Sequence, residues 1–314
     1  MPTHMHPGHS WKDRAVASHP LRETFDLTYG TGNGHNLTLD ILRPHAPLHP
    51  LRPAVLWVHG GGWRAGERQP HPNHALAERG FVTATMSYRL SDAAIFPAQI
   101  HDVKAALRYL RATSEDWGID AERIGIWGHS AGGHLAALAA VSEGIPTLEG
   151  EGGHPEESSA VQAAVPMSPP TDFLVDWFTK SNFPPHDEAL GAVAEFLDGN
   201  PLTDPEVSER AKLASPVRLA QPDAPPMLVV HGSQDDLVPV TQGKLLVAAL
   251  LDLGCDASLL ELPHDDHGLD SVFGAPGMVP VHLTDHAPVT PAMQEIVSFF
   301  ERTLGPVPPL TEAP

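Results

Sequence analysis

Short apolar runs alternate with segments of helical periodicity along most of this chain. Runs that are short and almost continuously apolar are typical of strands buried on both faces of a sheet. They lie at residues 54–58, 81–86, 124–127, 161–165 and 227–230, and a further strand is predicted at 258–262. Because strands and helices alternate, the pattern predicts an α/β fold with a mostly parallel, doubly wound sheet and helices on both faces.

Helices are predicted between these strands. Residues 131–141 form a small-residue helix, and residues 240–253 form another that ends at Gly254. Thr290 is a candidate cap for a last helix, which has Pro291 at its first position. Apolar residues at i, i+3, i+4 and i+7 mark one face of an earlier helix at Val103, Ala106, Leu107 and Leu110.

The N-terminal part of the chain shows a different pattern. Residues 24–29 and 36–42 flank the glycine-rich segment 30–34, which predicts an antiparallel hairpin at one edge of the sheet. Residues 1–20 carry several histidines among Pro, Gly and Ser, so we expect a flexible arm there. A single domain is expected over 21–305.

Three stretches rich in Pro, Gly and acidic residues interrupt the alternation, at 142–159, 169–213 and 274–290. Loops of that length in a compact domain more often form lids or binding loops than simple connections. Residues 306–314 are expected to form a C-terminal tail. Aromatic residues in the second stretch are candidates for a substrate pocket, although core packing explains them equally well: Phe173, Trp177, Phe178 and Phe183.

Charge and cysteine content narrow the class of function. With 39 acidic and 19 basic residues the net charge is −20, which disfavours nucleic acid or an anionic membrane as a partner. Cys255 is the single cysteine, so no intramolecular disulfide forms. There is no signal-peptide pattern at the N-terminus and no apolar run of about 18 residues, so a cytoplasmic location is expected. The sequence assigns no oligomeric state.

The segment Gly128-His129-Ser130-Ala131-Gly132 lies between a predicted strand and a predicted helix. A sharp turn there holds the serine side chain outward on a strained corner, and glycines two residues away on either side avoid collisions. A serine hydroxyl needs a base to accept its proton and an acid to orient that base. Ser130 is therefore a candidate nucleophile.

The acid and the base are sought after Ser130. Asp235 and Asp236 both follow the strand at 227–230, and one of them could instead cap the next helix. His264 and His267 follow the strand at 258–262, and His267 is preferred because the following Gly268 frees its backbone. A metal site in 264–267 is a weaker alternative, since four adjacent residues rarely enclose an ion.

A glycine run follows the strand at 54–58, in His59-Gly60-Gly61-Gly62-Trp63. Successive glycines let the main chain approach a ligand with its amides free, as the oxyanion of a tetrahedral intermediate requires. The amides of Gly61, Gly62 and Ala131 are the candidate donors. Trp63 and His129 are candidate substrate contacts together with Phe173 and Trp177.

With these motifs in place, the chain resembles the α/β-hydrolase carboxylesterases of the hormone-sensitive-lipase type. In particular it resembles bacterial esterases grouped with feruloyl esterases and kynurenine formamidases. The resemblance runs from about residue 24 to residue 304. It rests on the motifs His59–Trp63, Ser87–Leu90, Pro97–Gln99 with Asp102, Gly128–Gly133, Ser215–Val217 and His231–Pro239. It implies Asp235 as the catalytic acid and His267 as the base.

Two features depart from that pattern. Hormone-sensitive-lipase relatives usually have Asp before the nucleophile, whereas this chain has His129, which favours the feruloyl-esterase side. The Pro-rich stretch 274–290 is longer than expected and is a candidate lid, which affects any inference about substrate size.

The sequence therefore predicts a serine hydrolase that cleaves small acyl or aryl carboxylic esters, with a small-molecule substrate and no cofactor or metal. Amide hydrolysis, as in an arylformamidase or a small peptidase, is an alternative because the same triad serves both bonds. A non-catalytic ligand-binding homologue is a further alternative, disfavoured because all three triad residue types are present.

Overall fold

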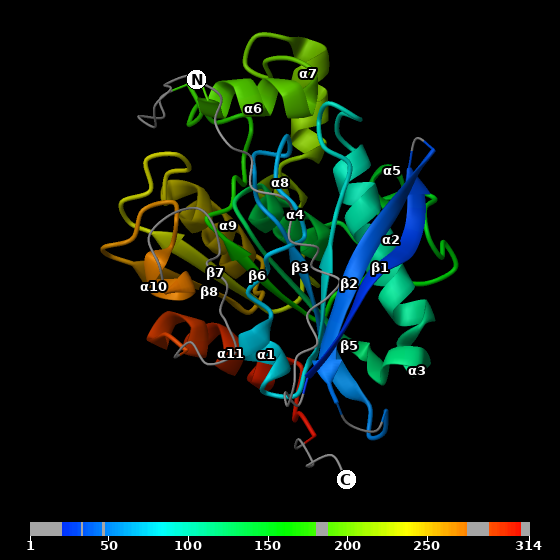
Figure 1. The fold of residues 1–314 in the computed structure, drawn as a ribbon. Coiled ribbons are helices and arrows are strands. Elements are labelled where there is room, and N and C mark those ends of the chain that lie inside the picture. The colour runs from blue at the N-terminus through cyan, green and yellow to red at the C-terminus, as the bar shows by residue number, and fades with distance from the viewer. Residues whose placement is uncertain (1–20, 33, 46–47, 180–187, 275–288, 309–314) are drawn as a thin grey trace, which may run out of the picture.

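The computed structural model describes residues 21–32, 34–45, 48–179, 188–274 and 289–308 (Figure 1). Its centre is an eight-stranded sheet in the order β1-β2-β4-β3-β5-β6-β7-β8. The strands are β1 Leu21–Gly32, β2 His35–Pro44, β3 Arg52–Val58, β4 Val82–Met86, β5 Ile119–His129, β6 Ala163–Met167, β7 Met227–Gly232 and β8 Ala257–Leu262. The pairs β1–β2 and β2–β4 are antiparallel, and all the other pairs are parallel.

Helices cover both faces of the sheet. They are α1 His74–Ala77, α2 Ala98–Ala112, α3 Ser114–Trp117, α4 Ala131–Val141, α5 Pro146–Glu149, α6 Glu188–Leu197, α7 Pro205–Leu213, α8 Pro216–Leu219, α9 Thr241–Asp252, α10 Asp270–Phe273 and α11 Pro291–Thr303. Helices α2, α4 and α9 pack on one face and helices α1, α10 and α11 on the other. No helix in the described ranges combines the length and the apolar character that a membrane crossing requires.

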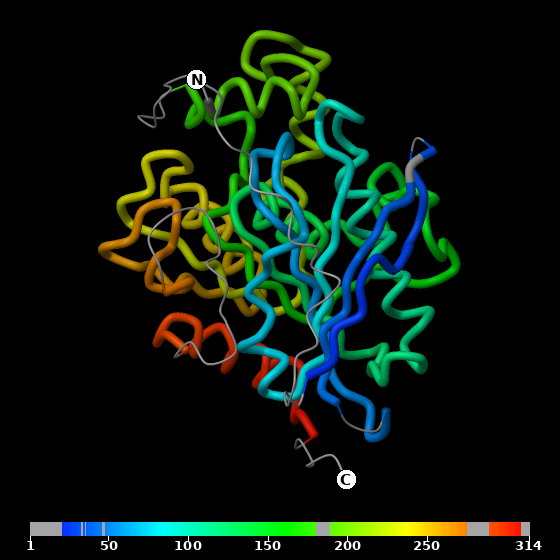
Figure 2. Tube along the Cα trace, in the orientation of Figure 1, coloured from blue at the N-terminus to red at the C-terminus, as the bar shows by residue number. Residues whose placement is uncertain are grey.

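The core is divided in two by the sheet. Along β3, Leu56 and Val58 point into the cluster under α2 and α4, whereas Val55 and Trp57 point into the cluster under α11. Side chains alternate between the faces of a strand, so a continuously apolar strand is required wherever helices cover both faces. Figure 2 shows the β1–β2 hairpin in dark blue along one side of the molecule, away from β7 and β8.

The predicted mostly parallel sheet with an antiparallel edge hairpin is confirmed. The stretch 169–213, expected as a loop, instead contains α6 and α7. Asp204 caps α7 by accepting hydrogen bonds from the amides of Glu206 and Val207, which gives this helix a defined start. The expected arm 1–20, most of the candidate lid 274–290, Phe183 and the end of the expected tail lie outside the described residues.

Parallel strands bring the loops after their carboxyl ends to one edge of the sheet. The loops that follow β3, β5, β7 and β8 carry the segment 59–63, Ser130, Asp235 and His267 respectively. All four groups of candidate residues therefore meet at the same edge, although more than 200 positions in the sequence (59 to 267) separate the first from the last.

Candidate active site

Ser130 lies at the corner between β5 and α4, with φ 57° and ψ −120°. A left-handed backbone is costly for a residue other than glycine, so the surrounding structure has to hold it. The Ser130 amide donates to the carbonyl of Met167 over 2.8 Å, which fixes the corner to β6. A Cβ on Gly132 would lie 2.0 Å from the carbonyl oxygen of Val58, and one on Gly128 would lie 2.5 Å from that of Gly132. Glycine is required at both positions because the chain segments pass so closely.

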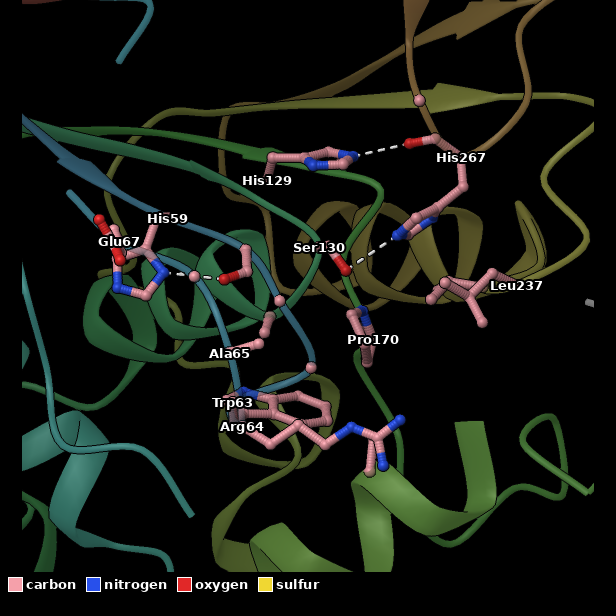
Figure 3. A pocket seen from close by; sticks show the side chains of 18 of the residues that line it. His59, Trp63, Arg64, Ala65, Glu67, His129, Ser130, Pro170, Leu237 and His267 are labelled. Carbon is pink, nitrogen blue, oxygen red and sulfur yellow. Dashed lines mark hydrogen bonds between the residues drawn. The ribbon is translucent and has the colours of Figure 1, made fainter. Parts of the chain in front are cut away.

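His267 lies opposite the Ser130 hydroxyl (Figure 3). Its Nε2 is 2.8 Å from Ser130 Oγ, and its Nδ1 is 2.8 Å from Oδ2 of Asp235. The imidazole is buried, with an exposed fraction of 3% for the residue. Since a carboxylate only accepts hydrogen bonds, Nδ1 carries the proton and the Nε2 lone pair faces the serine hydroxyl.

Asp235 is held by several donors at once. Its Oδ1 accepts the amides of Leu237 at 3.0 Å and Val238 at 2.8 Å, and its Oδ2 is 3.3 Å from Nε2 of His231. Burial acts to raise the pKa of Asp235, but the charge of His267 and hydrogen bonds from His231 and His267 outweigh it. The pKa therefore falls well below its usual range, and the carboxylate stays ionised.

The alternative candidates for the acid and the base differ from Asp235 and His267 in burial. Asp236 and His264 are both exposed, whereas Asp235 and His267 are buried and in contact with each other. The helix-cap role considered for one of the two aspartates is not seen: the N-cap of α9 is Val240, with no side-chain cap hydrogen bond, and the amides that Asp235 accepts lie in the loop before that helix. Among the described residues, no group of three His, Cys, Asp or Glu side chains is arranged to hold a metal ion.

The loop after β3 is shaped by glycines with a left-handed backbone. Gly61 has φ 107° and Gly62 has φ 58°. The carbonyl of Gly61 accepts the amide of Ala65 at 3.0 Å, and a Cβ on Gly61 would lie 2.2 Å from the carbonyl oxygen of Ala65. Within the described part of the chain, no hydrogen bond engages the amides of Gly61, Gly62 or Ala131. These three donors remain available to a ligand.

A cavity of about 400 Å³ opens over Ser130. Ligand sites are commonly concave, largely apolar and of this size. The residues along its walls come from the loop after β3, the corner at Ser130, the segment after β6, helix α6, the loops after β7 and β8 and helix α10. They include Trp63, Arg64, His129, Pro170, Trp177, Ala189, Ala192, Leu237, Val238 and Phe273 (Figure 3).

The aromatic candidates separate into two groups. Trp63, His129 and Trp177 line the cavity. Phe173 does not: it is fully buried behind Trp63, with ring centroids 5.7 Å apart, so it supports the wall from the core. Phe178 is also fully buried and packs edge-on against Trp177 at 5.3 Å.

His129 makes a contact that the sequence did not indicate. Its Nε2 donates to the carbonyl oxygen of His267 over 2.7 Å (Figure 3). Burial lowers the pKa of His129 to about 3, with the charge of His267 acting in the same direction, so the ring stays neutral near pH 7. His129 therefore lines the cavity and also holds the backbone of the residue that faces Ser130.

The three side chains are arranged so that His267 is able to take the proton of the Ser130 hydroxyl. A base within hydrogen-bond distance of a hydroxyl, itself oriented by a buried carboxylate, is the constellation that activates a serine nucleophile. Unused amides next to the serine supply donors for an oxygen that becomes negatively charged. Together these groups suit attack on a carbonyl carbon.

Comparison with known proteins gives a family and relatives. The family model described as BD-FAE matches residues 39–250. Esterase LipQ of Mycobacterium tuberculosis is 35% identical over 254 residues, which make up 79% of this chain and 58% of LipQ. The chain thus spans little more than half the length of this relative.

Solved structures with the same fold include esterases. A truncated carbohydrate esterase from gut microbiota superimposes with a TM-score of 0.74 at 26% identity, covering 90% of this chain and 96% of that one. A butyrate-bound thermophilic esterase from Thermogutta terrifontis gives a TM-score of 0.67 at 25% identity, covering 89% and 92%. These likenesses confirm the α/β-hydrolase fold that the sequence predicted.

Proposed function

This chain belongs to the BD-FAE family of α/β hydrolases, and from that premise we propose that it is a serine esterase that cleaves small acyl or aryl carboxylic esters. The observation that carries the proposal is the chain of two 2.8 Å contacts from Ser130 through His267 to Asp235. The esterase names of LipQ and of the gut carbohydrate esterase support the same reaction class.

In the proposed reaction, His267 accepts the Ser130 proton at Nε2 while Oγ attacks the ester carbonyl carbon. Asp235 stabilises the imidazolium that forms and keeps the proton of Nδ1 in place. Collapse of the tetrahedral intermediate expels the alcohol, which takes its proton from His267. Water then attacks the acyl group on Ser130, with His267 again as the base, and releases the acid.

The negative charge on the former carbonyl oxygen is stabilised by backbone donors. Gly61, Gly62 and Ala131 supply their amides, and Ala131 is the first residue of α4, so its N–H also lies at the positive end of that helix. Removing one such donor in other serine hydrolases costs about 10²–10³ in kcat, so this is expected to be one of the largest contributions to the rate.

The size and walls of the cavity support a small substrate. About 400 Å³ is ample for a short acyl chain or a single aromatic ring. The lining includes the apolar side chains of Trp177, Ala189 and Leu237, which suit an alkyl or aryl group.

The test is hydrolysis of p-nitrophenyl acetate and butyrate by the purified protein beside Ser130→Ala. We expect turnover by the unaltered protein and only background release of nitrophenol by the variant. Activity that survives the substitution would rule out the mechanism. Hydrolysis of N-formylkynurenine far faster than that of any ester would assign the chain to amide substrates, and binding without turnover of either would assign it to ligand-binding homologues.

A further inference from the structure

The proposed oxyanion donors come from two separate parts of the chain. Gly61 and Gly62 lie in the loop after β3, whereas Ala131 begins α4 after β5. Donors act on the same oxygen only if their positions agree within about 0.5 Å. Other contacts must therefore fix the position of the glycine loop relative to the start of α4.

Trp63 is the residue through which the loop is attached. It directly follows Gly62 and has φ 58°, a left-handed conformation that is unfavourable for a residue with a side chain and has to be held by the surrounding structure. Its indole is buried and stacks on Phe196 with centroids 4.3 Å apart. Its carbonyl oxygen accepts the amide of Ser91 at 2.8 Å. The loop is thus fixed by the side chain and carbonyl of Trp63.

His134 supplies the link to α4. Its Nδ1 accepts the indole N–H of Trp63 at 3.1 Å, and its Nε2 lies 2.7 Å from the carbonyl oxygen of Ala214. Because a carbonyl only accepts, Nε2 carries the proton and Nδ1 presents its lone pair to Trp63. The His134 amide donates to the carbonyl of Ser130 at 2.8 Å, so the ring stands one helical turn after the nucleophile.

We propose that His134 is a positioning residue, whose buried hydrogen bond with Trp63 locks the two halves of the oxyanion hole in register. This inference rests on the proposed function. His134 is completely buried, so no water competes for the bond. Burial also lowers the pKa of His134 to about 4, which keeps Nδ1 an acceptor near neutral pH.

The test compares Trp63→Phe, His134→Phe and the double variant. Trp63→Phe deletes the indole N–H and keeps an aromatic ring; His134→Phe deletes the acceptor and keeps the ring volume. Each single variant is expected to lower kcat on p-nitrophenyl butyrate about 10-fold or more, with KM changed less than about twofold. The inhibition constant of an alkyl trifluoromethyl ketone, which forms a tetrahedral adduct with the serine, should rise by the same factor.

The double variant tests whether Trp63 and His134 affect turnover through their shared hydrogen bond or independently of each other. Two residues that act through one shared bond lose little more together than singly, so the double variant should resemble either single variant. Effects that multiply in the double variant, or a kcat that stays unchanged in both single variants, would overturn the proposal.

Trp127→Phe is the matched control. Its indole N–H also donates to a buried side chain, Oδ1 of Asn73 at 3.2 Å, but Trp127 packs on the opposite face of the sheet. We expect a comparable loss of thermal stability without the rise in the ketone inhibition constant. An equal rise in Trp127→Phe would show that general destabilisation explains the result. Failure of the proposed function is distinguished because the unaltered protein would then lack turnover from the start.

Discussion

The imidazole Nε2 of His129 lies 2.7 Å from the carbonyl oxygen of His267, and this bond joins residues 138 positions apart. It connects the corner that carries Ser130 to the loop that carries His267. The His129 ring is also close to that of His267, with centroids 5.0 Å apart. His129 therefore fixes the backbone of His267, while Asp235 fixes its side chain.

Replacement of His129 by Phe should loosen the base loop. The carbonyl of His267 would lose its buried donor, a loss worth about 1–3 kcal/mol, and the imidazole would sample positions farther from Ser130. We expect kcat to fall about 10-fold with a smaller change in KM, measured with p-nitrophenyl acetate. An unchanged kcat would show that Asp235 alone holds the imidazole.

Substitutions of His264 and of His267 are predicted to have very different effects on kcat. His267→Ala removes the group 2.8 Å from Ser130 Oγ, and the loss of the base should lower kcat by about 10⁴-fold or more. His264→Ala changes an exposed side chain of the same loop and should retain kcat within about twofold. Comparable losses in the two variants would contradict the assignment of the base.

Asp235 and Asp236 provide a similar pair. Asp235→Asn keeps the side-chain shape but presents neutral groups to His267 Nδ1, which favours the wrong tautomer and leaves the imidazolium unstabilised. We expect a loss of about 10³–10⁴-fold in kcat. Asp236→Asn, at an exposed position, should stay within about twofold. Circular dichroism and thermal unfolding, which do not depend on the reactivity of Ser130, would check that both variants are folded.

The positions of Ser130, Asp235 and His267 could be predicted from the sequence because each lies in the segment that follows a strand of the parallel sheet. Strand ends in a parallel sheet share one edge, so the order of motifs along the chain carries spatial information. Between Asp235 and Asp236, strand position alone left both open; burial and contact with His267 distinguish them in the structure.

Contacts between distant segments could not be predicted in the same way. The bonds of His129 to His267 and of His134 to Trp63 depend on how loops pack, and no local pattern records them. Helix α7 is different, because Asp204 followed by Pro205 is a start signal for a helix. The acidic, Pro-rich surroundings led to the expectation of a loop there, and the local signal was outweighed.

Three buried histidines are predicted to make the protein less stable in mild acid. Burial lowers the pKa of His59 to about 4, of His129 to about 3 and of His134 to about 4. In the unfolded chain a histidine binds a proton below about pH 6.5. Between that pH and the folded-state pKa the unfolded state holds more protons, so the free energy of unfolding decreases as the pH falls.

Between pH 7 and pH 5 the free energy of unfolding is expected to decrease by ~2 kcal/mol per histidine, since each pKa unit corresponds to about 1.4 kcal/mol. Asp235, whose pKa is lowered, adds its own loss only below about pH 4, so the chosen range isolates the histidines.

Urea unfolding at pH 7 and pH 5 measures the difference in the free energy of unfolding. In His59→Phe, which keeps a ring able to stack on Tyr88, the difference between the two pH values should shrink by the contribution of one histidine. A midpoint that does not move between pH 7 and pH 5, or a variant with the same pH dependence as the unaltered protein, would show that these rings are protonated equally in the folded and unfolded states.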